Sequence, residues 1–508
     1  MDQLMRVELK AQITTDTADT LIVPCLKNQA LSPELQSRFE KAGISSAELL
    51  KDYCGEFKEV FWTYLPWENG SSKRVFLLGL GENPGFVQML TALRSFIHRY
   101  RSKLSPSIGL YVSHWQEDGP WRRHLEAALN GIYLGRYQLG MYKTEDNKPA
   151  PFQEDQASVE IFLPENRWEQ AQQVLQRVRH IASTQLEIFD LVNKPSNFVT
   201  PQALAQWAEK SGKTLGFQVK VLQKPALEQE GFHALLAVNR ASIDPAVFIV
   251  MDYQPKGRVP AATICLIGKG VTFDTGGLSI KPSSNMHFMK SDMGGAAAVL
   301  GAVEVAAKLN IPLRVIGLIP STDNSVDGLA VKPNEVISSY SGKTIEIIDT
   351  DAEGRLILAD GLSYAVRNFQ PDVLIDLATL TGSTIRTLGY SAGGLFCNND
   401  RLADALLRIG DSIGERLWRF PMWDDYKDGI KSDIADVKNF SGKPTAGAIY
   451  AAKFLEVFID GHPSWAHLDI AGVAVTDSEF GIQKTATAYG VRLLLEYFED
   501  LIEQKLMG

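Results

Sequence analysis

The chain has 508 residues, which is too long for one ordinary hydrophobic core, so we expect two domains. Hydrophobic residues make up 45% of the chain and charged residues 22%, as in globular proteins. The chain has 51 Lys and Arg against 60 Asp and Glu, a net charge of −9. This balance argues against a general binder of nucleic acid or anionic membrane, because no excess of cations is available to neutralise phosphates.

The N-terminal residues and the cysteines predict a cytoplasmic protein. The first residues show no apolar stretch of signal-peptide length, and no run approaches the ~20 apolar residues that a membrane span needs. The four cysteines are widely spaced and form no CxxC pair, so we interpret them as reduced thiols. They are Cys25, Cys54, Cys265 and Cys397.

Residues 1–165 predict a smaller N-terminal α/β domain, in which short strand-like runs alternate with helical stretches. A long helical pattern follows and predicts a linker helix over residues 166–195. The predicted strands of this domain are Leu21–Pro24, Val75–Leu80, Ile108–Val112 and Val159–Leu163.

Residues 196–508 predict a larger catalytic domain. Strand, loop and helix alternate there, with amphipathic helices such as Gly294–Asn310, which favours a mostly parallel central sheet covered by helices. The predicted strands are Gln218–Leu222, Val247–Met251, Thr263–Ile267, Leu313–Leu318, Thr344–Ile348, Val373–Asp376 and Trp465–Leu468.

The first polar segment of this domain follows the predicted strand at residues 263–267 and is rich in glycine. Lys269 comes directly after the strand, and Asp274 and Lys281 lie beyond it. The residues alone allow either a flexible loop with solvated charges or one side of a binding site. A phosphate loop is excluded, because its pattern needs Gly at 263 and Ser or Thr at 270, where the chain has Thr and Gly.

The second polar segment contains Asp292, directly before a run of small residues that predicts a helix. Asp292 is a candidate helix cap and also a candidate ligand, and the two roles are compatible. A further segment, Leu377–Gly382, follows another apolar strand and is either an ordinary turn or part of a site. His467 lies within a predicted strand, where we expect a packed or hydrogen-bonded side chain and no ligand.

The most informative segment contains Asp351, Glu353 and Arg355, between a predicted strand over residues 343–348 and a predicted helix over residues 355–367. In α/β proteins, chemistry collects at the carboxyl ends of strands. A cation at a helix N-terminus is locally unfavourable, so we expect a bound anion or nearby carboxylates to compensate Arg355.

The polar segments together supply four carboxylates, from Asp274, Asp292, Asp351 and Glu353. Four carboxylates cannot share one buried cleft without compensation, because like charges force protonation. Divalent metal ions solve this problem, and two ions ~3.5–4 Å apart can activate a water molecule between them.

These segments resemble the leucyl aminopeptidase (cytosol aminopeptidase) family of dinuclear metallopeptidases. The resemblance covers residues 190–500 clearly and the N-terminal region only in outline, as a macro-like domain. It rests on motifs with high specificity for this family. They are Gly268-Lys269-Gly270, Phe273-Asp274, Ser279-Ile280-Lys281-Pro282, Asp292-Met293, Thr350-Asp351-Ala352-Glu353-Gly354-Arg355-Leu356 and Trp465-Ala466-His467-Leu468-Asp469.

The resemblance implies a site with two divalent metal ions, either Mn or Zn, with Mg or Co as alternatives. Asp274 and Glu353 would bridge the ions, Lys269 and Asp292 would complete one site, and Asp351 the other. A lysine ligand must be neutral, and adjacent cations favour loss of its proton.

The resemblance also implies roles in catalysis and substrate binding. A metal-activated water would attack the scissile carbonyl, and Lys281 would stabilise the oxyanion. Arg355 would anchor a bicarbonate ion that acts as general base. In this family a pocket binds the first substrate side chain, and the residues of this chain at the matching positions are Met289, Thr379, Leu380 and Gly382.

The family implies cleavage of leucine-like N-terminal residues from peptides with a free N-terminus, by a homohexamer. One departure lies near the metals, because Asp349 stands where the family usually has Asn. Two other functions remain open: a non-catalytic or DNA-binding use of the same scaffold, and an amidohydrolase or phosphatase with a similar two-metal site.

Overall fold

The computed structural model describes residues 5–507 apart from residues 15, 29, 68–69, 113–114, 116–118 and 146–147. The chain forms two compact units, one of Met1–Leu186 with Ser478–Ile482 and one of Glu187–Asp477 with Gln483–Gly508. The division falls inside the long helix α5 (Trp168–Asn193). The boundaries at residues 165 and 195 and the linking role of the helix stay predictions.

The first unit contains a six-stranded sheet in the order β1-β6-β5-β2-β4-β3. All neighbours pair in parallel except β3 and β4. The four predicted strands correspond to β2, β4, β5 and β6, whereas the edge strands β1 and β3 were not predicted. The elements are β1 (Arg6–Lys10), β2 (Thr20–Cys25), α1 (Pro33–Lys41), α2 (Ser46–Asp52), β3 (Val60–Pro66), β4 (Ser72–Gly79), α3 (Phe86–Tyr100), β5 (Ser107–Tyr111), α4 (Trp121–Gly135) and β6 (Ser158–Phe162).

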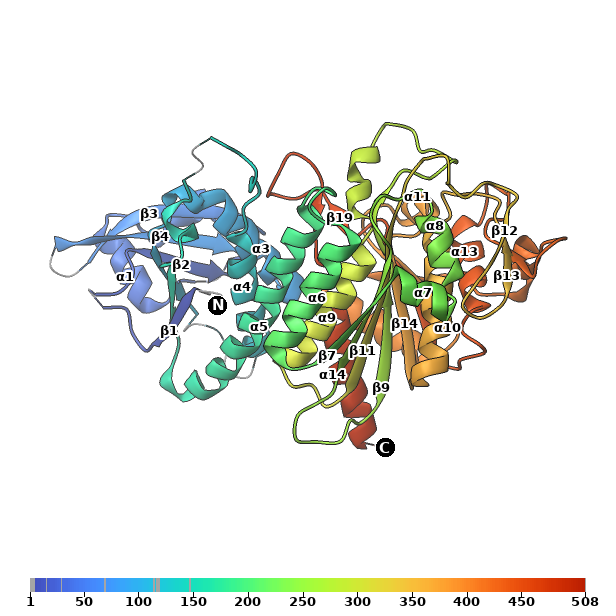
Figure 1. Ribbon diagram of the computed structural model, residues 1–508. Helices are drawn as coiled ribbons and strands as arrows, with labels where there is room; N and C mark the ends of the chain where they lie inside the picture. The colour runs from blue at the N-terminus through green and yellow to red at the C-terminus, as the bar shows by residue number, and fades with distance from the viewer. Residues whose placement is uncertain are drawn as a thin grey trace. The chain divides into compact units, whose positions relative to one another are not determined.

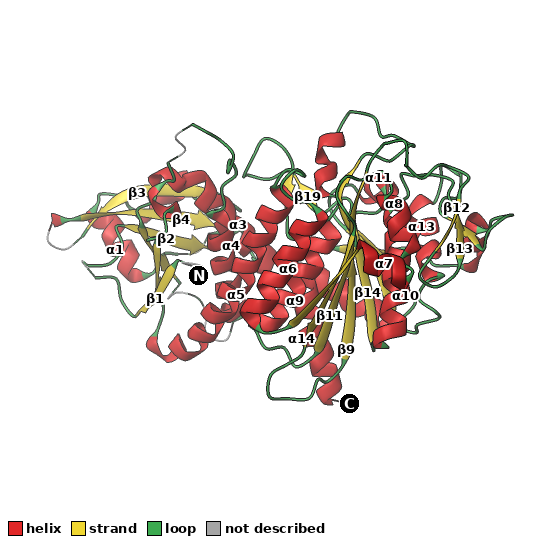
Figure 2. Ribbon diagram, viewed as in Figure 1, coloured by secondary structure: helices red, strands yellow, loops and turns green. Residues whose placement is uncertain are grey.

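The second unit is built on a nine-stranded sheet in the order β16-β15-β18-β14-β9-β11-β8-β7, with β10 paired to β11. Five of its pairings are parallel and three antiparallel. The α/β class and the mostly parallel sheet are confirmed (Figure 2). The strands are β7 (Gln218–Gln223), β8 (Val247–Tyr253), β9 (Thr263–Gly268), β10 (Gly270–Asp274), β11 (Arg314–Asn324), β14 (Val373–Ala378), β15 (Gly393–Cys397), β16 (Leu417–Arg419) and β18 (Trp465–Asp469).

Helices cover both faces of this sheet (Figure 1). Helices α6, α9 and α14 lie on one face, and α7, α8, α10 and α13 on the other. Within the described residues, no helix combines the length and apolar character required to cross a membrane. The helices are α6 (Pro201–Leu215), α7 (Lys224–Glu230), α8 (His233–Asn239), η5 (Met286–Ser291), α9 (Gly294–Lys308), α10 (Gly354–Phe369), α11 (Gly382–Leu388), α12 (Asp400–Ile413), α13 (Gly447–Glu456) and α14 (Val491–Met507).

Strands β9, β11, β14 and β18 run parallel, so their carboxyl ends share one edge of the sheet. Polar residues follow or end these strands, as expected for an α/β site. The strand predicted before Asp351 differs from this pattern. It is the short β13 (Thr344–Glu346), which belongs to a separate small sheet with β12 (Val336–Ser338) and β17 (Val437–Lys438). The strand predicted over residues 344–348 is therefore present over residues 344–346, but it does not belong to the main sheet with the other predicted strands.

Glycines let α9 approach the carboxyl edge of the sheet closely. A Cβ on Gly295 would lie 2.0 Å from the main-chain oxygen of Leu377, and one on Gly268 would lie 2.6 Å from Ala296 Cα. This contact allows Ala296 N to donate to Lys269 O at 2.9 Å. The small residues after Asp292 thus help to fix the main chain of Lys269, the first of the candidate metal ligands.

Candidate active site

Lys269 lies between β9 and β10, and only 3% of its side chain is exposed. Its main-chain N–H donates to Leu377 O at 3.0 Å. Its Nζ lies 2.7 Å from a carboxylate oxygen of Asp292 and 2.8 Å from one of Glu353, and it donates to Thr379 O at 3.1 Å. The interpretation of this segment as a flexible loop with solvated charges is therefore wrong for Lys269.

Lys281 forms a second bridge between carboxylates. Its Nζ lies 2.8 Å from Asp274 Oδ2 and also pairs with Asp351. Asp274 ends β10, and its other oxygen accepts hydrogen bonds from Gly276 N and Asn324 Nδ2, both at 2.9 Å. Each lysine thus pairs with two of the four candidate carboxylates, and the closeness of Asp274, Asp351 and Glu353 joins the two groups into one carboxylate–lysine cluster.

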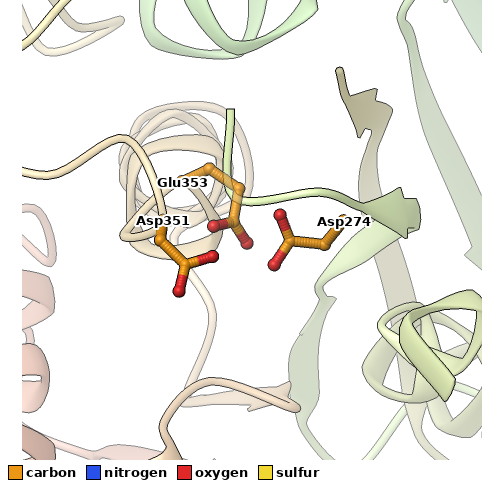
Figure 3. A group of neighbouring side chains, drawn as sticks. All are labelled: Asp274, Asp351 and Glu353. Carbon is orange, nitrogen blue, oxygen red and sulfur yellow. The ribbon is translucent and has the colours of Figure 1, made fainter. Parts of the chain in front are cut away.

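Asp274, Asp351 and Glu353 point toward one another in Figure 3. Each offers a carboxylate oxygen, and these oxygens all lie within 4.8 Å of one another. Glu353 Oε2 is buried and has no hydrogen-bond partner among the described residues. Close hard oxygen donors with an unsatisfied buried acceptor fit a divalent cation.

Burial acts on both kinds of charged group in this cluster. It raises the pKa of Asp351 to about 7 and also raises the pKa of Glu353 and of Asp292, and neighbouring carboxylates add to the shift of all three. Burial disfavours the charged lysines as well. The surrounding carboxylates outweigh it, so the pKa of Lys269 and that of Lys281 lie above the ordinary value. Both lysines are therefore cations when no metal is bound.

Arg355 is the second residue of α10, and 6% of it is exposed. Burial lowers the pKa of its guanidinium to about 10, although nearby carboxylates, first Glu353, oppose the shift. Its Nη1 donates to Asn439 O at 2.8 Å, whereas its buried Nε has no partner among the described residues. The neighbouring carboxylates thus supply part of the predicted compensation, and one donor remains for an anion.

Asn439, which the sequence did not single out, holds the segment before Glu353 in place. It is fully buried, and its Oδ1 accepts from Ile348 N at 2.8 Å. Its Nδ2 donates to Asp349 O at 2.6 Å. These bonds satisfy main-chain groups of an irregular segment that has no sheet partner. No local pattern marks Asn439, because its partners lie about 90 residues away in the chain.

Asp349 also helps to fix the main chain of the segment before Glu353. Its Oδ1 accepts from Asp351 N at 2.9 Å. An Asx-type contact of this kind stabilises a tight turn, and the amide oxygen of Asn could accept the same hydrogen bond. The replacement of Asn by Asp therefore keeps the turn and adds a negative charge to the cavity wall.

Asp469 plays a similar role for the segment that follows β14. It is fully buried at the end of β18. Its Oδ2 accepts from the hydroxyls of Thr381 and Thr384, both at 2.6 Å, and its Oδ1 accepts from Leu380 N at 3.1 Å. The segment Leu377–Gly382 is therefore a fixed wall of the site. Its interpretation as an ordinary strand-to-helix turn is incomplete.

Asp292 does not cap α9. The helix begins after Met293 without a side-chain cap, because the carboxylate of Asp292 turns toward Lys269 and accepts from Thr379 Oγ1 at 2.7 Å. The capping interpretation is therefore wrong. His467 behaves as predicted: it is fully buried and hydrogen-bonded through Nδ1 to Asp376 at 2.6 Å.

The cluster lies in a cavity of about 590 Å³. All the predicted metal ligands and both predicted catalytic residues line it, as do the four residues predicted for the first substrate side chain. We call those four the first-residue pocket. They are Met289, Thr379, Leu380 and Gly382.

Fold and site together define an α/β protein with an oxygen-rich centre suited to divalent metal. Residues 188–495 match the model of the cytosol aminopeptidase family, catalytic domain. A probable cytosol aminopeptidase from Chlorobium phaeobacteroides is 44% identical over 501 residues, which cover 96% of this chain and 99% of that protein. One from Chlorobium luteolum is 54% identical over 62% of each chain. The chain belongs to the cytosol aminopeptidase family and is a peptidase, that is, a hydrolase.

A solved structure agrees over nearly the whole chain. The bottromycin maturation enzyme BotP in complex with Mn superposes with a TM-score of 0.82 at 30% identity, covering 96% of this chain and 100% of that one. Family membership and the acidic cluster together support binding of a divalent metal.

Proposed function

We propose that this protein is an aminopeptidase that uses two divalent metal ions to hydrolyse the first peptide bond of substrates with a free N-terminus. The observation that carries the proposal is the convergence of Asp274, Asp351 and Glu353 within 4.8 Å, beside the buried Lys269 and the partly exposed Lys281. Asp274 and Glu353 would be shared by both ions. Lys269 and Asp292 would complete one site and Asp351 the other.

The donor set suits Mn or Zn, with Mg or Co as alternatives, because carboxylate oxygens dominate and one amine is available. When bound, the two ions would activate a water molecule and hold the substrate amino group. The unsatisfied Glu353 Oε2 supports this arrangement, because a buried carboxylate oxygen without a partner carries a desolvation cost that a cation would remove.

Two basic residues would act directly on the reacting groups. Lys281 is 21% exposed toward the cavity and would stabilise negative charge that develops on the scissile carbonyl oxygen. Arg355 would hold a bicarbonate ion through its buried Nε, and bicarbonate held there would supply a general base.

The first-residue pocket would accept apolar, leucine-like side chains. Met289 and Leu380 supply apolar surface, and further apolar residues, such as Phe288 and Ile385, line the same cavity. We also propose a homohexamer in the cytoplasm, as family resemblance suggests. Sedimentation of the purified protein as a monomer would contradict the assembly.

Hydrolysis of leucine amide tests the proposed function. We expect activity that a chelator abolishes and that Mn or Zn restores. N-acetyl-leucine amide should not be cleaved, because its blocked amine cannot bind a metal ion. Equal cleavage of the acetylated substrate, or full activity after verified metal removal, would exclude the proposal.

A further inference from the structure

Two cations line the active-site cavity outside the carboxylate–lysine cluster. Arg386 belongs to α11, and Lys484 directly precedes the short strand β20 (Thr485–Ala486), which pairs with β19 (Val475–Thr476). Both residues line the cavity. The sequence analysis assigned neither of them a role.

Neither cation is neutralised by a described residue. Within the part of the chain that the structure describes, the side chains of Arg386 and Lys484 make no ion pair and no hydrogen bond. Lys484 Nζ instead lies 3.3 Å from the ring centroid of Tyr390, which also lines the cavity and is 49% exposed. A cation–π contact holds an ammonium in place and leaves its charge available.

The remaining charges of the cavity wall belong to the cluster or lie next to it. The described lining residues of that group are Lys269, Asp274, Lys281, Asp292, Asp349, Asp351, Glu353 and Arg355. Outside that group, the described lining therefore has two positive charges, on Arg386 and Lys484, and no carboxylate. Such an arrangement attracts an anionic group from the ligand.

The position of Arg386 identifies the part of the substrate that meets these charges. A Cβ placed on Gly382 would lie 3.4 Å from Arg386 Nη1. Gly382 belongs to the first-residue pocket, so the guanidinium lies directly beside that pocket. A side chain that passes Thr379 and Gly382 would bring its tip toward Arg386.

We infer that Arg386 and Lys484 bind the side-chain carboxylate of an acidic N-terminal residue, so the enzyme removes Glu and Asp as well as apolar residues. This inference rests on the proposed aminopeptidase function. The apolar wall at Met289 would contact the methylene groups of Glu, and the two cations would contact its carboxylate. Glu reaches farther than Asp and fits this arrangement better. An N-terminal Lys or Arg would be repelled.

The test compares Glu-amide with Gln-amide on the Mn-loaded full-length enzyme, because the two side chains have nearly the same shape. We expect kcat/KM for Glu to exceed that for Gln by about fivefold at low salt, as for a partly solvated ion pair. The preference should shrink in ~0.5 M NaCl, where screening is strong.

Variants connect the preference to the two side chains. Arg386→Gln and Lys484→Gln should each bring the Glu:Gln ratio toward one, and the ratio cancels any general loss of activity. Arg386→Glu should reverse the discrimination and favour Lys-amide over Glu-amide. Arg401→Gln, an exposed arginine on α12, is the matched control and should keep the parent ratio.

A wild-type ratio of one or less, or a ratio above one that neither glutamine variant changes, would overturn the inference. A preference for Leu-Glu over Leu-Gln dipeptides that depends on Arg386 would also overturn it. That result would mean that Arg386 binds the side-chain carboxylate of the second substrate residue and not that of the first. Failure to cleave leucine amide at all would instead count against the proposed function.

Discussion

At the scale of single residues, Glu353 carries a buried carboxylate oxygen whose hydrogen-bonding capacity is not satisfied by the described residues. It is almost fully buried, one of its oxygens contacts Lys269, and the other has no hydrogen-bond partner among the described residues. We expect Glu353→Gln to reduce kcat/KM for leucine amide by about 100-fold or more, because the amide cannot bridge two cations with negative charge. Metal analysis after dialysis should show less than the parent metal content.

The control for this change is Glu503→Gln on the exposed part of α14, which should keep parent activity and metal content. Glu353→Gln is nearly isosteric, so the fold should survive, and circular dichroism can verify this. Parent activity in a folded Glu353→Gln protein would remove Glu353 from the ligand set.

The shifted pKa values predict that metal binding releases protons. The pKa of Lys269 is raised in the metal-free cluster, so the lysine is charged, whereas a lysine ligand must be neutral. Burial raises the pKa of Asp351 to about 7, so this carboxyl is partly protonated near neutral pH. We expect release of at least one proton per subunit when Mn fills both sites, and an apparent affinity that increases from pH 6 to pH 8.

Calorimetric titrations in buffers with different ionisation enthalpies measure this proton release directly. The heat of Mn binding should depend on the buffer with the sign of proton release. A heat that is independent of the buffer, or an affinity that falls with increasing pH, would show that Lys269 keeps its proton and is not a ligand.

At the scale of elements, the start of α10 positions Lys269. A Cβ on Gly354 would lie 2.5 Å from Lys269 Cε and 2.7 Å from its Nζ. Alanine is favoured over glycine within a helix by about 1 kcal/mol, so Gly354→Ala does not weaken α10 through its propensity. We therefore expect Gly354→Ala to displace the lysine and lower Mn affinity and kcat/KM by at least tenfold.

Gly361→Ala on the same helix is the matched control. Its Cβ would contact Ile267 Cγ2 at 3.0 Å, away from Lys269, so some stability but little activity should be lost. Equal activity losses in both variants would mean that general disturbance of α10, and not contact with Lys269, explains the effect.

The elements also show which structural features the sequence could predict. Buried parallel strands such as β9 and β14 are mostly apolar runs, so their positions were predicted to within two residues. Strand β10 was missed because it is separated from β9 by Lys269 alone and its glycine resembles a loop. The short β13 was assigned to the wrong sheet, because strand pairing is non-local and leaves no periodic signal.

At the scale of the whole molecule, the ligand-bearing motifs could be predicted, but their supports could not. Lys269, Asp274 and Glu353 lie in segments with distinctive residue patterns. Asn439 and Asp469 contact these segments from distant parts of the chain, and their own neighbours give no local sign of the role. Arg386 was missed for a related reason, because only the folded cavity shows that this arginine of α11 has no acidic partner in the described part of the chain.

The second unit also contains a buried carboxyl that connects three of its elements. Asp360 lies on α10, is fully buried, and accepts from Leu235 N of α8 at 2.9 Å and from Tyr340 N, near β12, at 2.7 Å. Burial raises its pKa from 3.8 to about 7, although the main-chain donors oppose the shift. The folded state therefore binds this proton more tightly than the unfolded state.

This difference makes the stability of the molecule depend on pH. The stabilising contribution of Asp360 is complete below about pH 4 and is lost as the pH rises through about 7. We expect Asp360→Asn to destabilise the protein, because its amide would face one of the two N–H donors. The loss of stability should be larger at pH 5 than at pH 8, by on the order of 2 kcal/mol, since the parent carboxyl is a costly buried anion at pH 8.

Calorimetric unfolding of the parent and variant at both pH values measures this difference, with Asp404→Asn on the surface of α12 as the control. A loss that is the same at both pH values, or larger at pH 8, would mean that Asp360 is already ionised at pH 5 and that its main-chain donors outweigh its burial.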